Sequence, residues 1–225
     1  MHSGAAAELS EAEQALVAAV IRGEVAEMRR AIVRGTVLRE LILEARPGWQ
    51  VPPAGIRLSR VIVDGGLDLE GVTLTKPLIF WHSRIQGGGD RGALVVRDAR
   101  LKRLGIHSST IDGNIVADRV EIESGLFLGG GAVRGHLTIR GGDITGALAL
   151  EGTEIGDGKL AIAAAGLALT GPLILRRTKA LGEVLVPRCR LGAGIYGEDL
   201  EISHQGTALN AESAELGGDL LLDRA

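Results

Sequence analysis

The sequence has almost no cysteine and few aromatic residues. Cys189 is the single cysteine among 225 residues, so no disulfide can form within the chain, and such a sequence suits a reducing compartment. Phe, Trp and Tyr make up 2 % of the residues, whereas the apolar fraction is 45 %. The core must therefore consist of Val, Ile, Leu and Ala. Together with 34 glycines, this composition is typical of short strands joined by tight turns.

The sequence also lacks a charge bias and a long apolar run. Its 28 acidic and 25 basic residues give a formal charge of −3, which does not favour nucleic acid as a partner. The longest apolar stretches are far shorter than a membrane-spanning helix, and no secretory signal is visible between Met1 and Glu13. We therefore expect a cytoplasmic protein without a transmembrane segment. Peripheral contact with a membrane surface stays open.

Residues 1–50 predict a short helical cap. Ser10 followed by Glu13 is the pattern of a capping box, and apolar residues follow at helical spacing as far as Ile32. Gly35 then stops this run, and a short second helix is expected after it. Prolines at positions 47, 52 and 53 mark the end of the helical pattern and the change to a different sequence pattern.

From about Ile56 one template recurs. An aliphatic residue is usually followed by glycine two places on and by further aliphatics four and six places on. Copies begin eleven residues apart at positions 111, 122, 133, 144 and 155, and again at 169, 180, 191 and 202. The register breaks at residues 87–92, which read as an inserted turn, and at LKRLGIHSST, which is one residue short. So regular a spacing predicts a repeat architecture.

The template predicts a mainly β fold, a right-handed parallel β-helix over residues 51–225. Aliphatics at +4 and +6 share one face of a strand, and the glycine at +2 suits a turn. One strand and two turns in eleven residues cannot close a coil, so we expect two units per coil, stacked as a solenoid of six or seven coils. An antiparallel sandwich would not need identical spacing, and a left-handed hexapeptide helix would need a six-residue period.

The chain resembles a group of bacterial β-helical repeat proteins often labelled membrane-associated oxidoreductases. The likeness covers LSEAEQALVAAVIRGEVAEMR and TVLRELIL in the helical start, the junction PPAGIRLSRVIVDGGLDLEG, and the late unit LGGDLLL. The resemblance implies a repeat fold and, through the family's label, an oxidoreductase. More distantly, the chain is similar to pentapeptide-repeat proteins and bactofilins, which are β-helices that bind partners or polymerise.

The sequence predicts no catalytic residue, cofactor or metal site. Cys189, between two arginines, is interpreted as an ordinary thiol near a coil corner. Residues 87–90, Gly-Gly-Gly-Asp, lack the Lys-Ser/Thr of a phosphate-binding loop. Acidic pairs such as Asp64 and Asp68 are interpreted as solvated turn charges. The histidines fall at different template offsets and are interpreted as surface or turn residues: His2, His82, His107, His136 and His204.

Two sets of apolar residues predict protein contacts. The +5 position should point outward, yet most units place an apolar residue there, and alternate units would stack these residues into one stripe. Strand propensity, or a cover of N-terminal helices, would also account for an apolar +5 position. Leu220 and Leu222, in the last unit, are candidates for an interface at the coil end. The stripe consists of Ile79, Phe127, Ala149, Ile174, Tyr196 and Leu221.

These observations favour a non-catalytic structural or protein-interaction scaffold that associates with itself, as a dimer, through the stripe or the coil end. The alternative is an enzyme or enzyme subunit, either redox or carbohydrate-acting, as the family label implies. A convergent polar cluster on one side of the rod would distinguish the alternative from the scaffold.

Overall fold

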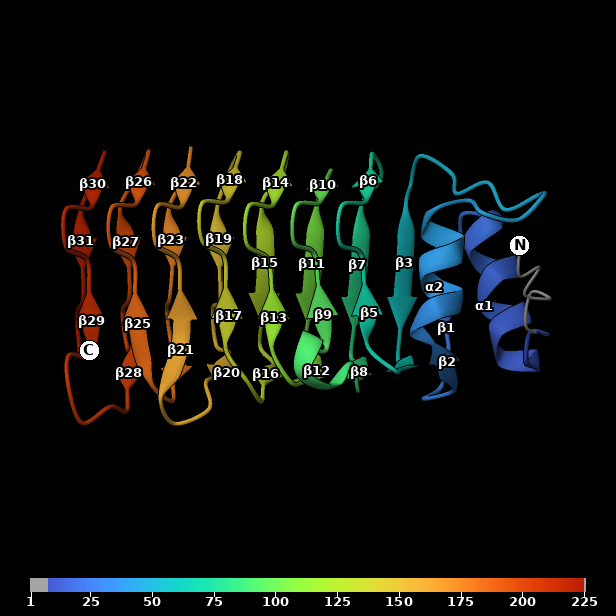
Figure 1. Ribbon diagram of the computed structural model, residues 1–225, viewed down its shortest axis with the longest axis horizontal. Coiled ribbons are helices and arrows are strands. Elements are labelled where there is room, and N and C mark those ends of the chain that lie inside the picture. The colour runs from blue at the N-terminus through green and yellow to red at the C-terminus, as the bar shows by residue number, and fades with distance from the viewer. Residues whose placement is uncertain (1–7, 225) are drawn as a thin grey trace.

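The computed structural model describes residues 8–224 and shows a rod of stacked coils with helices at one end (Figure 1). Each complete coil adds one short strand to each of four parallel sheets, here named A to D, which run along the rod. Successive strands of a sheet pair in register, as when Leu126 pairs with Leu148. The predicted fold class is confirmed: a parallel β-solenoid of about eight turns, with about 22 residues in each.

Sheets A and B follow one another around each coil. Sheet A consists of β1 (Ala26–Glu27), β3 (Ile56–Ser59), β7 (Leu78–Trp81), β11 (Leu104–His107), β15 (Leu126–Gly129), β19 (Leu148–Ala149), β23 (Leu173–Ile174), β27 (Ile195–Tyr196) and β31 (Leu220–Leu221). Sheet B consists of β2 (Ile32–Arg34), β4 (Ile62–Asp64), β8 (Arg84–Gln86), β12 (Thr110–Asp112), β16 (Ala132–Val133), β20 (Glu154–Ile155), β24 (Lys179–Ala180) and β28 (Glu201–Ile202).

Sheets C and D complete the coil. Sheet C consists of β5 (Leu67–Asp68), β9 (Leu94–Val95), β13 (Ile115–Val116), β17 (Leu137–Thr138), β21 (Leu160–Ala163), β25 (Glu183–Leu185) and β29 (Leu209–Asn210). Sheet D consists of β6 (Thr73–Leu74), β10 (Arg100–Leu101), β14 (Glu121–Ile122), β18 (Asp143–Ile144), β22 (Ala168–Leu169), β26 (Arg190–Leu191) and β30 (Glu215–Leu216).

Each eleven-residue unit supplies two strands, not the one that the template predicts. In the unit that starts at Ile144, this first aliphatic already belongs to β18 of sheet D, and Leu148 at +4 belongs to β19 of sheet A. The next unit provides the strands of sheets B and C. The expectation of one strand per unit is wrong. The aliphatic residue that opens the template is also buried in a strand, and this strand of two residues is too short to show the alternation by which a strand is recognised in a sequence.

The core positions agree with the template. The aliphatic residues at +4 and +6 are at most 1 % exposed in two representative units, as Leu137, Ile139, Leu173 and Leu175 show. Their counterparts in neighbouring coils are other aliphatics, so the interior is a stack of Leu, Ile, Val and Ala layers with Phe80 as its fully buried aromatic residue.

The recurrent glycine is explained by the close approach of neighbouring coils. Gly135 lies in a bend, and a Cβ atom added there would stand 2.6 Å from the carbonyl carbon of Gly113 in the preceding coil. Gly171 has the same relation to Gly146, at 2.8 Å. A side chain at either position would force adjacent coils apart, which would lengthen their backbone hydrogen bonds.

The N-terminal segment differs from the expectation in its middle. Helix α1 (Glu11–Ile21) carries the predicted capping box, but the chain leaves the helix at Arg22 and forms β1 and β2, which pair with β3 and β4. The predicted helical run as far as Ile32 is therefore wrong. Val33 is buried whereas Ile32 is 58 % exposed, which is the alternation of a strand. These two strands begin an additional coil, and the solenoid has about eight turns instead of six or seven.

Gly35 begins a helix rather than only ending one. Helix α2 (Gly35–Ile42) starts against the next coil, where a Cβ atom on Gly35 would lie 1.6 Å from the carbonyl oxygen of Gly66. The helix packs on β5 and occupies the place that a sheet C strand has in later coils. The expected inserted turn at residues 87–92 is confirmed and contains a 3-10 helix, η1 (Gly89–Arg91).

An ion pair between the buried Glu13 and the partly exposed Arg34 fastens α1 to the first coil. The Glu13 carboxylate accepts hydrogen bonds from the Arg34 backbone N–H (3.0 Å) and from its guanidinium (2.6 and 2.7 Å), and also from the Ser10 N–H (2.9 Å). These bonds to Arg34 and Ser10 outweigh the opposing effect of burial and lower the pKa of Glu13 from 4.5 to about 2.

We predict that replacing Leu137 with Asp strongly destabilises the solenoid. Deleting a buried Leu side chain alone costs roughly 2–5 kcal/mol, and an unpaired carboxylate in an aliphatic layer adds a desolvation cost. Urea unfolding followed by circular dichroism should show the loss. Leu185→Asp, at a half-buried outward position of the same sheet, is the matched control and should cost much less. Equal stabilities of the two variants would contradict the register.

We predict that acid loosens the cap through Glu13. Because its pKa is lowered in the folded state, Glu13 stabilises the fold above pH 4.5, and this contribution is lost as the pH falls from 4.5 towards 2. The shift corresponds to about 3 kcal/mol. Thermal melts at a series of pH values should show that Glu13→Gln is less stable at pH 7 and flatter below pH 4.5. Glu24→Gln, at an exposed pair, should follow the wild type.

Candidate functional site

The residues of the predicted stripe form one continuous outward column on sheet A. Strand pairing aligns Phe127 with Ala149, Ala149 with Ile174, Ile174 with Tyr196, and Tyr196 with Leu221. On the other side of Phe127 the column passes through Gly105, a position that the template did not reveal, before it reaches Ile79. We call this set the central column: Ile79, Gly105, Phe127, Ala149, Ile174, Tyr196 and Leu221.

The N-terminal helices do not cover the central column. They lie at the end of the rod beside β3, whereas the column runs from β7 to β31 (Figure 1). Ile79, Phe127, Ile174 and Tyr196 are half-buried by their neighbours, and Leu221 is 38 % exposed. The rod therefore presents apolar side chains to its surroundings at six of these seven coils, whereas the seventh position, Gly105, is buried beside the His107 ring.

Three of the five aromatic residues of the chain lie on this one face. Trp81 stands beside the central column and stacks on His107, with ring centroids 6.4 Å apart and planes inclined by 25°. Phe127 and Tyr196 belong to the column itself. In a chain so poor in aromatic residues, their outward placement on one sheet is a feature that core packing does not require.

Two arginines lie over the aromatic rings of the column. The guanidinium carbon of Arg103 is 4.6 Å from the centroid of the Phe127 ring, and that of Arg176 is 5.5 Å from the Tyr196 ring. Arg176 also pairs with Glu198 at 2.7 Å. Arg103 has no ion pair within residues 8–224, and its Nε atom is buried without a hydrogen-bond partner there. Burial, and after it the charge of Arg103, lower the pKa of His107 below its usual range.

The face has opposite charges at its two ends. Arg103 provides an unpaired positive charge near the N-terminal end. Near the other end, Asp219 and Asp223 flank Leu221, and neither carboxylate has an ion pair within the described residues. Sequence reasoning missed Arg103 because the unit LKRLGIHSST is one residue short at the corner before β11, which moves Arg103 and Gly105 out of template register.

The candidate coil-end residues lie in the last described coil. Leu220 is 52 % exposed and Leu222 is half-buried, although Ile195, the counterpart of Leu220 in the preceding coil, is fully buried. Leu220 is exposed because no further coil packs on it within the described part of the chain.

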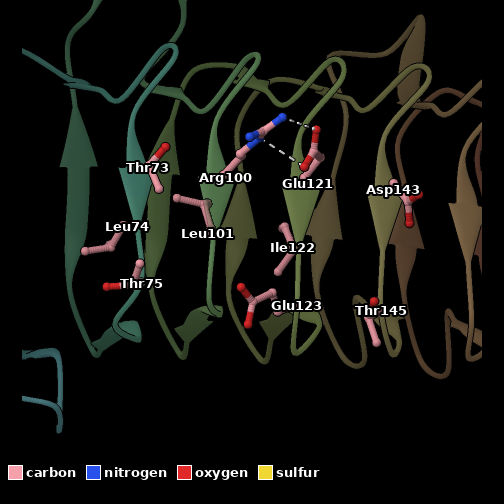
Figure 2. A pocket seen from close by; sticks show the side chains of 10 residues that line it. All are labelled: Thr73, Leu74, Thr75, Arg100, Leu101, Glu121, Ile122, Glu123, Asp143 and Thr145. Atoms are coloured by element: carbon pink, nitrogen blue, oxygen red, sulfur yellow. Dashed lines mark hydrogen bonds and ion pairs between the residues drawn. The ribbon is translucent and has the colours of Figure 1, made fainter.

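A shallow hollow of about 340 Å³ lies along the outer side of sheet D. Figure 2 shows its residues on β6, β10, β14 and β18, with Arg100 and Glu121 pointing toward one another. These two side chains pair at 3.1 Å, and Lys102 pairs with Glu123 at 2.6 Å on the same face. A second hollow of about 710 Å³ continues from Asp143 towards β30. All four paired side chains are about half exposed or more. The ion pairs that join neighbouring coils along this hollow are therefore solvated.

The histidines lie at separate places in the fold. His82 is an exposed corner residue, His107 lies on sheet A, and His136 bonds Asp157 at 3.1 Å. His204 lies beyond β28, and His2 falls outside the described residues. Within residues 8–224 no group of three or more His, Cys, Asp or Glu side chains has the arrangement of a metal site.

The buried Cys189 fits the interpretation as a thiol near a coil corner. Its Sγ atom donates to the Ala164 carbonyl at 2.9 Å, and burial raises the pKa of the thiol. The neighbouring arginines point into a different environment from the sulfur, since Arg188 and Arg190 are not buried.

Comparison of the chain with models of protein families, with curated proteins and with solved structures gives no significant match in any of the three. None of the helices in residues 8–224 combines the length and the apolar character that crossing a membrane requires.

We predict that a maleimide reagent labels Cys189 only after unfolding. A thiol that is 0 % exposed and has a raised pKa offers neither access nor thiolate. Mass spectrometry of native and urea-unfolded protein should show labelling in the second sample alone. Rapid labelling of the native protein would contradict this prediction and would show that the corner between the strands of sheets C and D, where Cys189 lies, opens readily.

Proposed function

We propose that this protein is a non-catalytic interaction scaffold that associates with itself, and that the outer face of sheet A is its contact surface. The observation that supports the proposal is the central column, an apolar ladder with Phe127 and Tyr196 on it, which lies in register over seven coils and is free of the N-terminal helices. Contiguous apolar surface of this kind marks contact sites on proteins.

Strand propensity alone accounts poorly for this column, because it would act on all four sheets. Outward positions of sheet B carry charged residues such as Arg84, Glu154 and Lys179. Sheet D carries Arg100, Glu121 and Asp143 at the equivalent places. The outward column of sheet C mixes polar residues with aliphatic ones and contains Asp68, Val95, Val116, Thr138, Ala163, Leu185 and Asn210. Aromatic side chains occupy an outward column on sheet A only.

We further propose a relation to the bacterial β-helical repeat proteins often labelled membrane-associated oxidoreductases. The support is the sequence likeness described above, and its segments have structural roles here. The helical start contains Glu13, whose ion pair with Arg34 fastens α1 to the first coil. The junction PPAGIRLSRVIVDGGLDLEG forms β3, β4 and β5. The likeness thus concerns residues that build the solenoid. The partner we propose is protein, because the formal charge of −3 gives no basic surface suited to nucleic acid.

The proposal is tested by sedimentation of the purified chain over a wide concentration range. We predict a reversible dimer that Tyr196→Lys converts to monomer, because a buried lysine would lose its hydration on the apolar face. Leu185→Lys, on the opposite sheet, is the matched control and should leave the dimer unchanged. If Leu220→Lys abolishes association while Tyr196→Lys does not, the coil end is the interface and the sheet A proposal is wrong. A monomer at every concentration would reject self-association.

A further inference from the structure

Every insertion between β3 and β31 lies at the corner where sheet B passes into sheet C. Equivalent buried positions of neighbouring strands are seven residues apart from sheet A to sheet B, and from sheet C to sheet D, in every coil of this part. From sheet B to sheet C the spacing is four residues in most coils, as between Ala180 and Val184, but seven or nine in three coils. The longer connections contain residues 87–92, 156–159 and 203–208. In repeat proteins, insertions that gather on one face often mark the binding face.

Two of these loops border a hollow of about 660 Å³. The loops at residues 156–159 and 203–208 belong to coils that are separated by one coil, whose own corner consists only of residues 181 and 182. This corner is tight, because a Cβ atom on Gly182 would lie 2.5 Å from the Leu160 nitrogen. A low corner between two longer loops leaves the hollow. Its volume falls in the range of sites that bind small molecules.

Both loops are anchored to this intermediate coil by hydrogen bonds. The Gly158 N–H donates to the Leu181 carbonyl at 2.8 Å, and the Ser203 N–H donates to the Ala180 carbonyl at 2.8 Å. Within the first loop, the Asp157 carboxylate accepts hydrogen bonds from the backbone N–H groups of the two residues at 159 and 160, both at 2.9 Å. The walls of the hollow are therefore fixed in advance, which lowers the cost of ordering them when a ligand binds.

The side chains around this hollow are hydrogen-bond donors, and none of them is a carboxylate. The two hollows along sheet D, by contrast, both contain the carboxylate of Asp143. Within residues 8–224 the four side chains that line the corner hollow make neither a hydrogen bond nor an ion pair, so the protein itself does not engage their donor groups. The lining residues come from both loops: Gly158, Lys159, Ser203, His204 and Gln205.

The carboxylates that neighbour these loops are engaged or placed outside the hollow. Asp157 bonds to His136 in the preceding coil at 3.1 Å. Glu201 pairs with Lys179 at 3.6 Å, and Glu183, on the intermediate coil, does not line the hollow. The ammonium group of Lys159 therefore faces the hollow without a lining carboxylate to neutralise it, and this charge favours an anionic ligand.

We propose that this hollow binds a phosphate monoester group of a small ligand. An ammonium, a hydroxyl, an imidazole and a carboxamide from two loops match an anion with three acceptor oxygens, and lysine is a common phosphate ligand. A carboxylate, which is planar and has two oxygens, is matched best by the fork of an arginine, and no arginine lines this hollow. The site does not involve the outer face of sheet A, so the inference goes beyond the scaffold function.

The test is a nuclear magnetic resonance titration of the isotope-labelled full chain with inorganic phosphate at constant ionic strength. We expect saturable shifts confined to the amides of residues 158–159 and 203–206. Lys159→Gln should weaken binding about tenfold, because it removes a charge-assisted hydrogen bond. Lys102→Gln, at an exposed lysine of sheet D, makes the same change of charge and should bind like the wild type. Shifts that follow ionic strength alone, or equal affinities of Lys159→Gln and the wild type, would overturn the site.

Further arms identify the anion and its source. Acetate at the same concentration should produce no local shifts, and a response equal to that of phosphate would reject a phosphate site. A phosphate monoester occurs on soluble molecules and on the headgroup of phosphatidic acid. Saturation by glycerol 3-phosphate, without sedimentation on phosphatidylcholine vesicles that contain phosphatidic acid, assigns a soluble ligand. Sedimentation on these vesicles, but not on pure phosphatidylcholine, that Lys159→Gln abolishes assigns the lipid headgroup.

Discussion

The whole structure depends on the in-register stacking of one coil on the next. Backbone N–H groups of one coil donate to carbonyl groups of a neighbouring coil, as Leu150 N–H does to Ile174 in the next coil at 2.8 Å and Glu154 N–H does to Gly131 in the preceding coil at 3.0 Å. Stacking this close leaves no room for a side chain where the backbones of two corners nearly touch, which fixes glycine at Gly135 and Gly171. It also fixes what fills the interior, because each coil must present an aliphatic layer that matches its neighbours.

The same stacking turns a sequence period into a surface. A position that recurs once per coil becomes a straight column on the outside of the rod, so a few substitutions at one offset create an extended patch. Sheet A illustrates this with Phe127, Ile174 and Tyr196, which are far apart in the chain and lie on neighbouring strands. Ion pairs between coils, such as Arg119 with Asp98 at 2.6 Å, use other columns in the same way.

Much of the fold could be predicted from the sequence because the period is both local and repeated. The burial of Leu137, the coil of two units and the Ser10–Glu13 capping box all follow from short patterns. The strand character of residues 26–34 could not be predicted, because apolar residues there fit a helical spacing and only pairing with β3 and β4 decides between the two. Tertiary hydrogen bonding overrides a local preference at this point.

The candidate site could be predicted in part for the same reason. Alignment by template offset placed Phe127, Ile174 and Tyr196 in one stripe, but it missed Gly105 and Arg103. A unit shortened by one residue displaces both from their offsets, and only the pairing of β7 with β11 restores their places. The omission matters because Gly105, which is buried beside the His107 side chain, interrupts the series of apolar side chains, and because Arg103 places a cation over the Phe127 ring.

A solenoid has two kinds of surface through which it can meet another chain, and they differ in what they can recognise. A coil end offers backbone N–H and C=O groups, whose pairing is almost independent of sequence, so it selects partners weakly. A side-chain column has an order of sizes and charges, and specificity requires such an order because a wrong register must be penalised. For these reasons the outer face of sheet A, and not a coil end, is the contact surface that we propose.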